Sequence, residues 1–119
     1  MIIEKLQKHI YSKLSPLYTV YDYIPENPKY PYIYINDILM QENGCKNRRG
    51  YDINIYLNVV STYKGKKEVY EISNKVFELL RDIQIDNASI HYSNNNLSVR
   101  CLKTGFNDGL INISYKILN

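Results

Sequence analysis

The clearest regular pattern lies in residues 51–60, where apolar and polar side chains alternate along the chain. One set of alternate positions holds Tyr51, Ile53, Ile55, Leu57 and Val59, and the other set includes Asp52, Asn54 and Asn58. A period of two places alternate side chains on opposite faces of a β-strand. The pattern therefore predicts a strand with one buried face, followed by a short link at residues 61–65.

Beyond this link the apolar spacing changes to that of a helix. The apolar positions are Val69, Ile72, Val76, Leu79, Leu80 and Ile83, and helical periodicity gathers them on one face. Glu68 and Glu71 lie in the first turns and Arg81 near the end, as the helix dipole favours. We expect this helix to cover the apolar face of the preceding strand.

The first third of the chain predicts one more helix and two more strands. Residues 2–14 carry an amphipathic pattern that ends before Pro16, and residues 19–24 are rich in β-branched and aromatic side chains. The proline-containing segment 25–31 interrupts regular structure. Residues 32–38 alternate again, and we expect them to pair with residues 51–60.

The connection at residues 39–50 is long for a hairpin and contains three cations, Lys46, Arg48 and Arg49. One interpretation is a solvated, flexible loop. The other is a basic finger that contacts a phosphate backbone or an acidic partner surface. Both stay open at the level of the sequence.

Three strands are predicted after the central helix, at residues 88–92, 97–103 and 110–118. Turn-forming residues at 93–96 and 104–109 would join them as a meander. The elements together predict one α+β domain spanning residues 1–119. Its sheet is mainly antiparallel with five to six strands, and two helices pack on one face in the order α-β-β-β-α-β-β-β.

Composition narrows the class of protein. A hydrophobic fraction of 45% in 119 residues indicates a folded chain, and no apolar run is long enough to span a membrane. The N-terminus has no signal-peptide pattern, so we expect synthesis in the cytoplasm and free thiols at Cys45 and Cys101. The net charge of +3 is too small to indicate nucleic-acid binding by itself.

Catalytic motifs are weak. His9 and His91 have no Cys, Asp or Glu at metal-ligand spacing, and residues 64–67 carry only a fragment of a phosphate-binding loop. Glu68, Glu71 and Glu78 are expected to be solvated on the outer face of their helix. We therefore predict a protein that is not an enzyme, with no catalytic residues, no cofactor and no metal site.

The order of the parts and several runs resemble a known family. The run Tyr30-Pro31-Tyr32-Ile33-Tyr34-Ile35, the polar loop, residues 51–62 and the helix entry at Gly65-Lys66-Lys67-Glu68 are similar to the tail terminator, or tail completion, proteins of long-tailed phages. The resemblance is strongest over residues 30–80. It implies a structural protein of the virion tail, encoded by a phage or prophage and assembled in the host cytoplasm.

The resemblance further implies a hexameric ring that caps the tail tube, ends its polymerisation and joins the head. The implied partners are the tail tube protein and a head-completion or neck protein, with nonspecific contact to DNA in the channel left open and no membrane. From the residues themselves, Tyr70 and Phe77 form a second stripe on the central helix that either widens the core or contacts a neighbouring subunit. Lys46, Arg48 and Arg49 would face the channel or a partner.

Two other functions fit the same sequence. A head-closure or neck adaptor would be another ring of the same virion, and its loss would not alter tail length. A small nucleic-acid-binding module would use Lys46, Arg48 and Arg49 for backbone contact and exposed tyrosines for stacking.

Overall fold

The computed structural model describes residues 2–42, 50–85, 89–102 and 105–118 of the chain. Its elements in chain order are α1 (Ile2–Leu14), β1 (Thr19–Tyr21), β2 (Tyr32–Glu42), β3 (Gly50–Ser61), α2 (Lys67–Leu80), β4 (Ser89–Cys101) and β5 (Asn107–Leu118). The α+β fold with a mostly antiparallel sheet is therefore confirmed.

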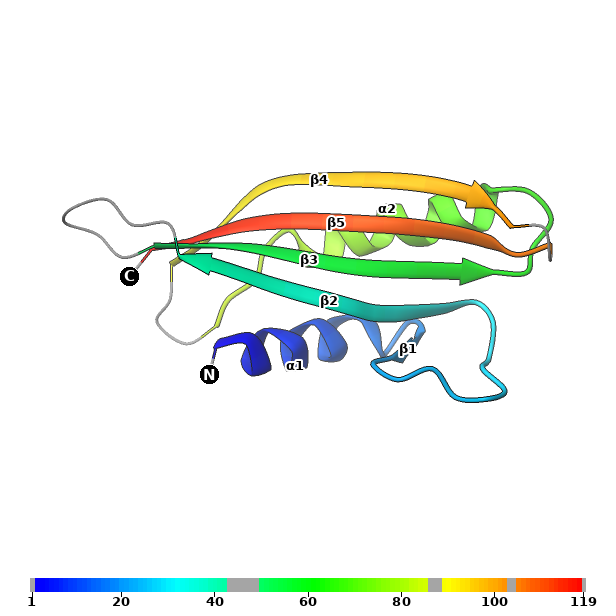
Figure 1. The fold of residues 1–119 in the computed structure, drawn as a ribbon, viewed down its shortest axis with the longest axis horizontal. Helices are drawn as coiled ribbons and strands as arrows, with labels where there is room; N and C mark the ends of the chain where they lie inside the picture. Colours follow the sequence, from blue (N-terminus) through cyan, green and yellow to red (C-terminus); the bar gives the residue numbers. More distant parts are fainter. Residues whose placement is uncertain (1, 43–49, 86–88, 103–104, 119) are drawn as a thin grey trace.

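The strands form one five-stranded sheet in the order β1-β2-β3-β5-β4 (Figure 1). The alternating segment predicted to be central is the middle strand, β3, and it pairs antiparallel with β2 as expected. β1 is parallel to β2, and the other pairs are antiparallel. The long strands run along the long axis of the molecule, which measures 51 × 22 × 22 Å (Figure 1).

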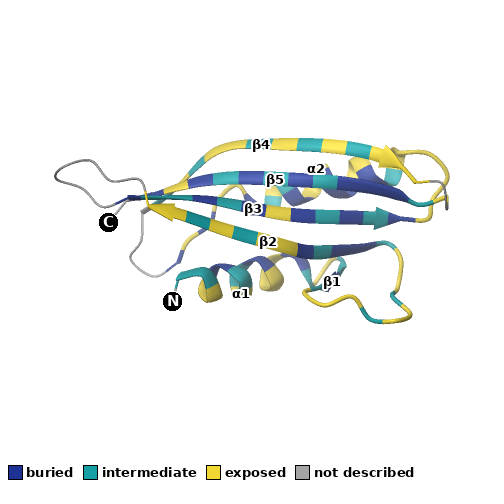
Figure 2. Ribbon diagram, in the orientation of Figure 1, coloured by how far each residue is buried: buried dark blue, intermediate teal, exposed yellow. Residues whose placement is uncertain are grey.

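Both helices contribute to one core on a single face of the sheet. Leu6, Ile10 and Leu14 come from α1, and Val69, Ile72, Val76 and Leu80 come from α2. These side chains pack on alternate residues of the strands, chiefly isoleucines of β3 and β5, which appear as the dark bands along the strands (Figure 2). The buried Tyr115 hydroxyl donates a hydrogen bond to the Leu80 carbonyl at the end of α2.

The prediction of three strands after α2 is wrong, because β4 runs without a turn through residues 93–96. The register shifts between Tyr92 and Asn94, so a bulge at Ser93 takes up the irregular residue. Twelve residues of β4 pair with residues of β5. The free energy of these backbone hydrogen bonds outweighs the preference of the asparagines for a turn.

Other boundaries also differ from the predictions, among them the ends of β1, β2 and α2. β1 ends at Tyr21 instead of residue 24. Because β1 and β2 are parallel, residues 22–31 must carry the chain back from the end of β1 to the start of β2. β2 continues to Glu42 past a register shift between Ile35 and Asp37, which shortens the predicted loop. α2 ends at Leu80, and Ile83 is buried just beyond it.

Candidate interaction surfaces

The sheet face opposite the helices is polar and carries a chain of hydrogen bonds across four strands. Asn36 on β2 donates to Asn58 Oδ1 on β3 at 2.8 Å, and Asn58 donates to Asp108 Oδ1 on β5 at 3.2 Å. Arg100 on β4 donates to Asp108 Oδ2 through Nη2 at 3.0 Å and through Nε at 3.3 Å. The chain of contacts fixes the orientation of these side chains and neutralises Asp108 locally.

A shallow hollow of about 540 Å³ opens on this face. Outward side chains from β2, β3, β5 and β4 line it, including Asp37, Tyr56, Asn96 and Asn112. A second set of polar contacts lies nearby, where Ser114 Oγ donates to Asn54 Oδ1 at 2.6 Å. Because amides and hydroxyls satisfy one another here, the polar side chains of this face are held in place.

A different surface lies where β2 begins, β3 ends and α2 begins. We call it the loop end, and it consists of residues 22–31, 62–66, 102 and 105–106. Tyr30 stacks on Phe106 with ring centroids 5.1 Å apart, and it also contacts Tyr32. The stack joins the β1–β2 connection to the β4–β5 connection. Exposed apolar or aromatic side chains gather on the loop end at Tyr23, Ile24, Tyr30, Tyr63 and Leu102.

The β3–α2 connection within the loop end is hydrogen-bonded to the side chain of Asn107, at the start of β5. This side chain is only 4% exposed, and its Nδ2 donates to the carbonyls of Tyr63 at 2.9 Å and Gly65 at 2.7 Å. Ser61 Oγ accepts from the Tyr63 amide and donates to Glu68 Oε1 at 2.7 Å. Gly65 takes a φ of 85°, which favours glycine. The connection therefore has a defined shape in the free chain.

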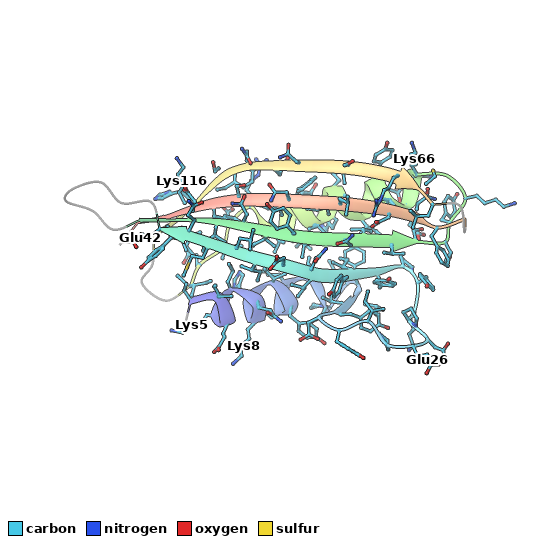
Figure 3. All side chains as sticks on the ribbon, viewed as in Figure 1. Lys5, Lys8, Glu26, Glu42, Lys66 and Lys116 are labelled. Atoms are coloured by element: carbon cyan, nitrogen blue, oxygen red, sulfur yellow. The ribbon has the colours of Figure 1, made fainter. Side chains whose placement is uncertain are left out.

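The same connection is positively charged. Lys64 and Lys66 are exposed, and neither has an ion-pair partner among the residues that the structure describes. Lys67 follows in the first turn of α2 and lies 4.0 Å from Glu71. Lys66 and Glu26 project at this end of the molecule, whereas Glu42 and Lys116 lie at the opposite end (Figure 3).

The two predicted interface residues on α2 differ in their exposure to solvent. Tyr70 is 50% exposed, whereas Phe77 is partly buried and packs against the core. Their contact with a neighbouring subunit stays a prediction. Lys46, Arg48 and Arg49 lie outside the described residues, and so does Cys45.

In the described part of the chain, the glutamates of α2 and Cys101 form ion pairs or hydrogen bonds with neighbouring side chains. Glu71 and Glu78 form surface ion pairs, whereas Glu68, expected to be solvated, is partly buried and bonded to Ser61. The Cys101 thiol is free and donates to Asn107 Oδ1 at 2.9 Å. Within the described residues no three His, Cys, Asp or Glu side chains gather as metal ligands.

His9 lies on α1 and is partly buried. Its Nε2 is buried and has no hydrogen-bond partner among the described residues. Burial, and then the nearby charge of Lys13, lower the pKa of His9 from its ordinary value. The folded chain therefore favours the neutral ring more strongly than the unfolded chain does.

Comparison with known proteins shows the family of the chain. Residues 12–98, more than half of the chain, match the family model described as "Tail completion protein gp17". The chain belongs to this family of tail completion proteins. A comparison with curated proteins finds no match.

A solved structure matches this tail completion protein along nearly its whole length. The structure is described as "Virion of native gene transfer agent (GTA) particle", with 14% sequence identity and a TM-score of 0.78. The match covers 98% of this chain and 97% of the other. At this identity the likeness shows a shared fold, while the family match shows a structural protein of the virion tail.

The sequence resemblance to tail completion proteins is thus confirmed. Neither described helix of this tail completion protein is long and apolar enough to cross a membrane. The loop end and its support by Asn107 were not recognised from the sequence. The one available signal was the dense group of turn residues at positions 104–109 of the sequence. Among them, Asn107 reaches the Gly65 carbonyl only after the sheet has formed.

Proposed function

We propose that this tail completion protein forms a hexameric ring on the finished tail tube, ends tube polymerisation and provides the surface that joins the head. The observation that carries the proposal is the family match over residues 12–98, which spans β1, β2, β3, α2 and most of β4. The absence of a metal-ligand cluster in the described residues is compatible with a purely structural role.

The shape of the subunit is suited to a ring. Its two sheet edges are unlike, since β1 has three residues and β4 has thirteen. Side-by-side contact between unlike surfaces is heterologous, and such contacts generate a closed ring when the rotation between subunits closes. Tyr70 would contribute to this contact, with Phe77 supporting it from the core side.

The two ends of the ring would meet different partners. One end would bind the last ring of tail tube protein, and the other would receive a head-completion or neck protein. Lys46, Arg48 and Arg49 would face the channel or one of these partners, and in the channel they would meet DNA without sequence preference. Assembly would take place in the host cytoplasm.

Electron microscopy of particles assembled without this protein tests the proposal. Loss of a cap should leave tails that do not join heads, with tubes that run past the normal length because nothing blocks the growing end. Restoring the wild-type chain from a second copy should return both tail length and joining to normal.

A head-closure or neck adaptor is the runner-up function, and the same experiment distinguishes it. Loss of an adaptor should leave free tails of normal length beside heads that fail to retain DNA. Tails of normal length in the deletion would therefore contradict the capping function and support the adaptor.

A further inference from the structure

The sheet has an open edge on each side of the molecule (Figure 1). On one side, β1 pairs only with residues 32–34, and β2 continues to Glu42 with no strand beyond it in the described part of the chain. On the other side lies β4, the last of the described strands, which is thirteen residues long. An open edge presents backbone N–H and C=O groups that can pair with a further strand. We call residues 37–42 the β2 edge and residues 94–101 the β4 edge.

Both edges lack features that commonly prevent pairing with another chain. Each segment is continuous, because the register shifts of β2 and β4 lie outside it. Neither segment contains lysine or proline, with which many proteins protect such edges. Among their charged side chains, Asp37 accepts a hydrogen bond from the Ile38 amide at 2.9 Å, Arg100 donates to Asp108, and Glu42 ends β2. The charges of Asp37 and Arg100 are therefore already engaged within the chain.

Apolar side chains on the helix-facing side of both edges are incompletely covered. Two residues of each edge pack against the core and are only partly buried: Ile38 and Met40 on β2, and Leu97 and Val99 on β4. A hollow of about 610 Å³ lies beside Ile35, between α1 and the end of β1, so α1 does not fill the space next to β2 there. A strand added at either edge would remove apolar surface from water, which is favourable.

A second copy of this chain fits both edges at once. Each of the pairs β2–β3, β3–β5 and β5–β4 is antiparallel, so β4 runs in the opposite direction to β2. Rotation about an axis along the strands preserves these directions, so β4 of one subunit would meet β2 of the next in an antiparallel pair. The same rotation keeps the helices of both subunits on one side, where the partly buried side chains of the two edges would cover one another. A strand from an unrelated protein would fill one edge and leave the other open.

We propose that the β2 edge of each subunit binds the β4 edge of the neighbouring copy, so that the sheets of adjacent subunits join around the ring. The inference rests on the proposed function, which supplies the ring, and it adds the contact that closes the ring. The contact is heterologous, because two different edges meet, and in a closed ring every subunit uses both. Residues 32–34 take no part, since β1 covers them.

Paired cysteines test this contact in tails assembled with the full chain. All variants carry Cys45→Ser and Cys101→Ser, so that only introduced thiols react. One introduced cysteine is Leu39→Cys on the β2 edge, where the leucine is 49% exposed. Opposite residues of antiparallel strands have Cβ atoms about 4.5–5.5 Å apart, near enough for mild oxidation to form a disulfide. Thermal unfolding confirms that each variant is folded.

The second cysteine scans the β4 edge, because strand tilt in a ring decides which residues lie opposite. It replaces Asn94, Asn96 or Ser98, which are exposed at alternate positions, and two of these line the same hollow as Leu39. Asn27→Cys with Leu39→Cys is the matched control, since Asn27 is exposed in the β1–β2 connection. Each cysteine is also introduced alone.

For at least one β4 position, we expect oxidation to convert most of the chain into covalent multimers larger than dimers on a non-reducing gel. The single variants and the Asn27 control should stay monomeric. In the wild type, amide exchange in residues 37–42 should slow roughly tenfold or more on assembly, because these amides enter a protected ladder. If the cysteine variants fail to fold, this exchange measurement decides.

Several results would overturn the inference while leaving the proposed function intact. One is a chain that stays monomeric at all three β4 positions in tails of normal length, and another is unchanged exchange in residues 37–42 on assembly. Dimers formed by a single cysteine would show that like edges meet about a two-fold axis. Multimers of equal yield in the Asn27 control would show unspecific oxidation. If the wild-type chain does not restore tail length in the deletion, the proposed function and the inference both fail.

Discussion

At the scale of single residues, Gly109 sets how closely α2 approaches the sheet. A Cβ atom at this position of β5 would lie 2.6 Å from Val69 Cγ1 and 3.5 Å from Ser73 Oγ. Carbon atoms do not approach one another so closely without displacement. Val69 is fully buried, so its side chain cannot turn toward solvent to avoid an added Cβ atom.

Replacing Gly109 with alanine should therefore destabilise the fold by about 1–3 kcal/mol, the usual cost of overpacking. Val69→Ala in the same chain removes the atom that clashes. Urea unfolding of the wild type, both single variants and the double variant measures the coupling. The double variant should be more stable than the sum of the single effects implies. Simple additivity would show that Val69 does not limit the helix position.

His9 should make stability depend on pH. Its folded-state pKa is lowered below the unfolded value of about 6.5, so the unfolded chain binds more protons on acidification. The free energy of unfolding should be constant above that value and should fall as the pH drops from about 6.5 toward the folded pKa. His9→Gln should reduce the slope measured by urea unfolding between pH 7.5 and 5.5. If the slope is unchanged in His9→Gln, His9 is not the cause of the pH dependence of stability.

At the scale of elements, the two strongest periodic patterns predicted their structures well. Most buried positions of β3 and α2 are β-branched or aliphatic, and each element can be recognised from its own residues. β4 could not, because Ser93, Asn94, Asn95 and Asn96 favour a turn when considered alone. Their extended form depends on β5, which follows later in the chain and supplies the hydrogen-bonding partner.

The loop end could not be predicted from local sequence either. The sequence places Tyr63, Lys64 and Phe106 in loops, but their position at one end of the molecule depends on strand order and on Asn107. A side-chain amide that bonds two backbone carbonyls over forty residues away leaves no local signal. The predicted interface pair illustrates the reverse case, since helical spacing placed Tyr70 and Phe77 together and the depth of the core separates them.

Asn107 should be the main support of the β3–α2 connection. Asn107→Ala leaves the Tyr63 and Gly65 carbonyls without their donor, which costs about 0.5–1.5 kcal/mol per hydrogen bond because these residues are exposed and water can replace the donor. Amide exchange at residues 62–66 should accelerate more than exchange in the middle of β3. Cys101→Ala is the matched control, because it removes the other partner of Asn107 and keeps both donated bonds. Equal exchange in the wild type and Asn107→Ala would contradict this role.

At the scale of the whole molecule, the proposed ring would be closed through the sides of an elongated subunit with unlike sheet edges. Tyr70, half exposed on α2, is the predicted contact there. Tyr70→Ser should leave the unfolding free energy within about 0.5 kcal/mol of the wild type, as surface substitutions do. Native mass spectrometry or light scattering of the assembled ring should then show a shift toward smaller species. A ring of unchanged stability would exclude Tyr70 from the interface.

The most direct test of the account is the length of tail tubes polymerised from purified tube protein with increasing amounts of this chain. A cap predicts progressively shorter tubes, with the chain bound as a ring at tube ends and not along their length. Addition of the chain after polymerisation should leave length unchanged and should prevent further growth when more tube protein is supplied. Tubes that grow to the same length at every concentration of the folded chain would contradict the proposal that it ends tail polymerisation.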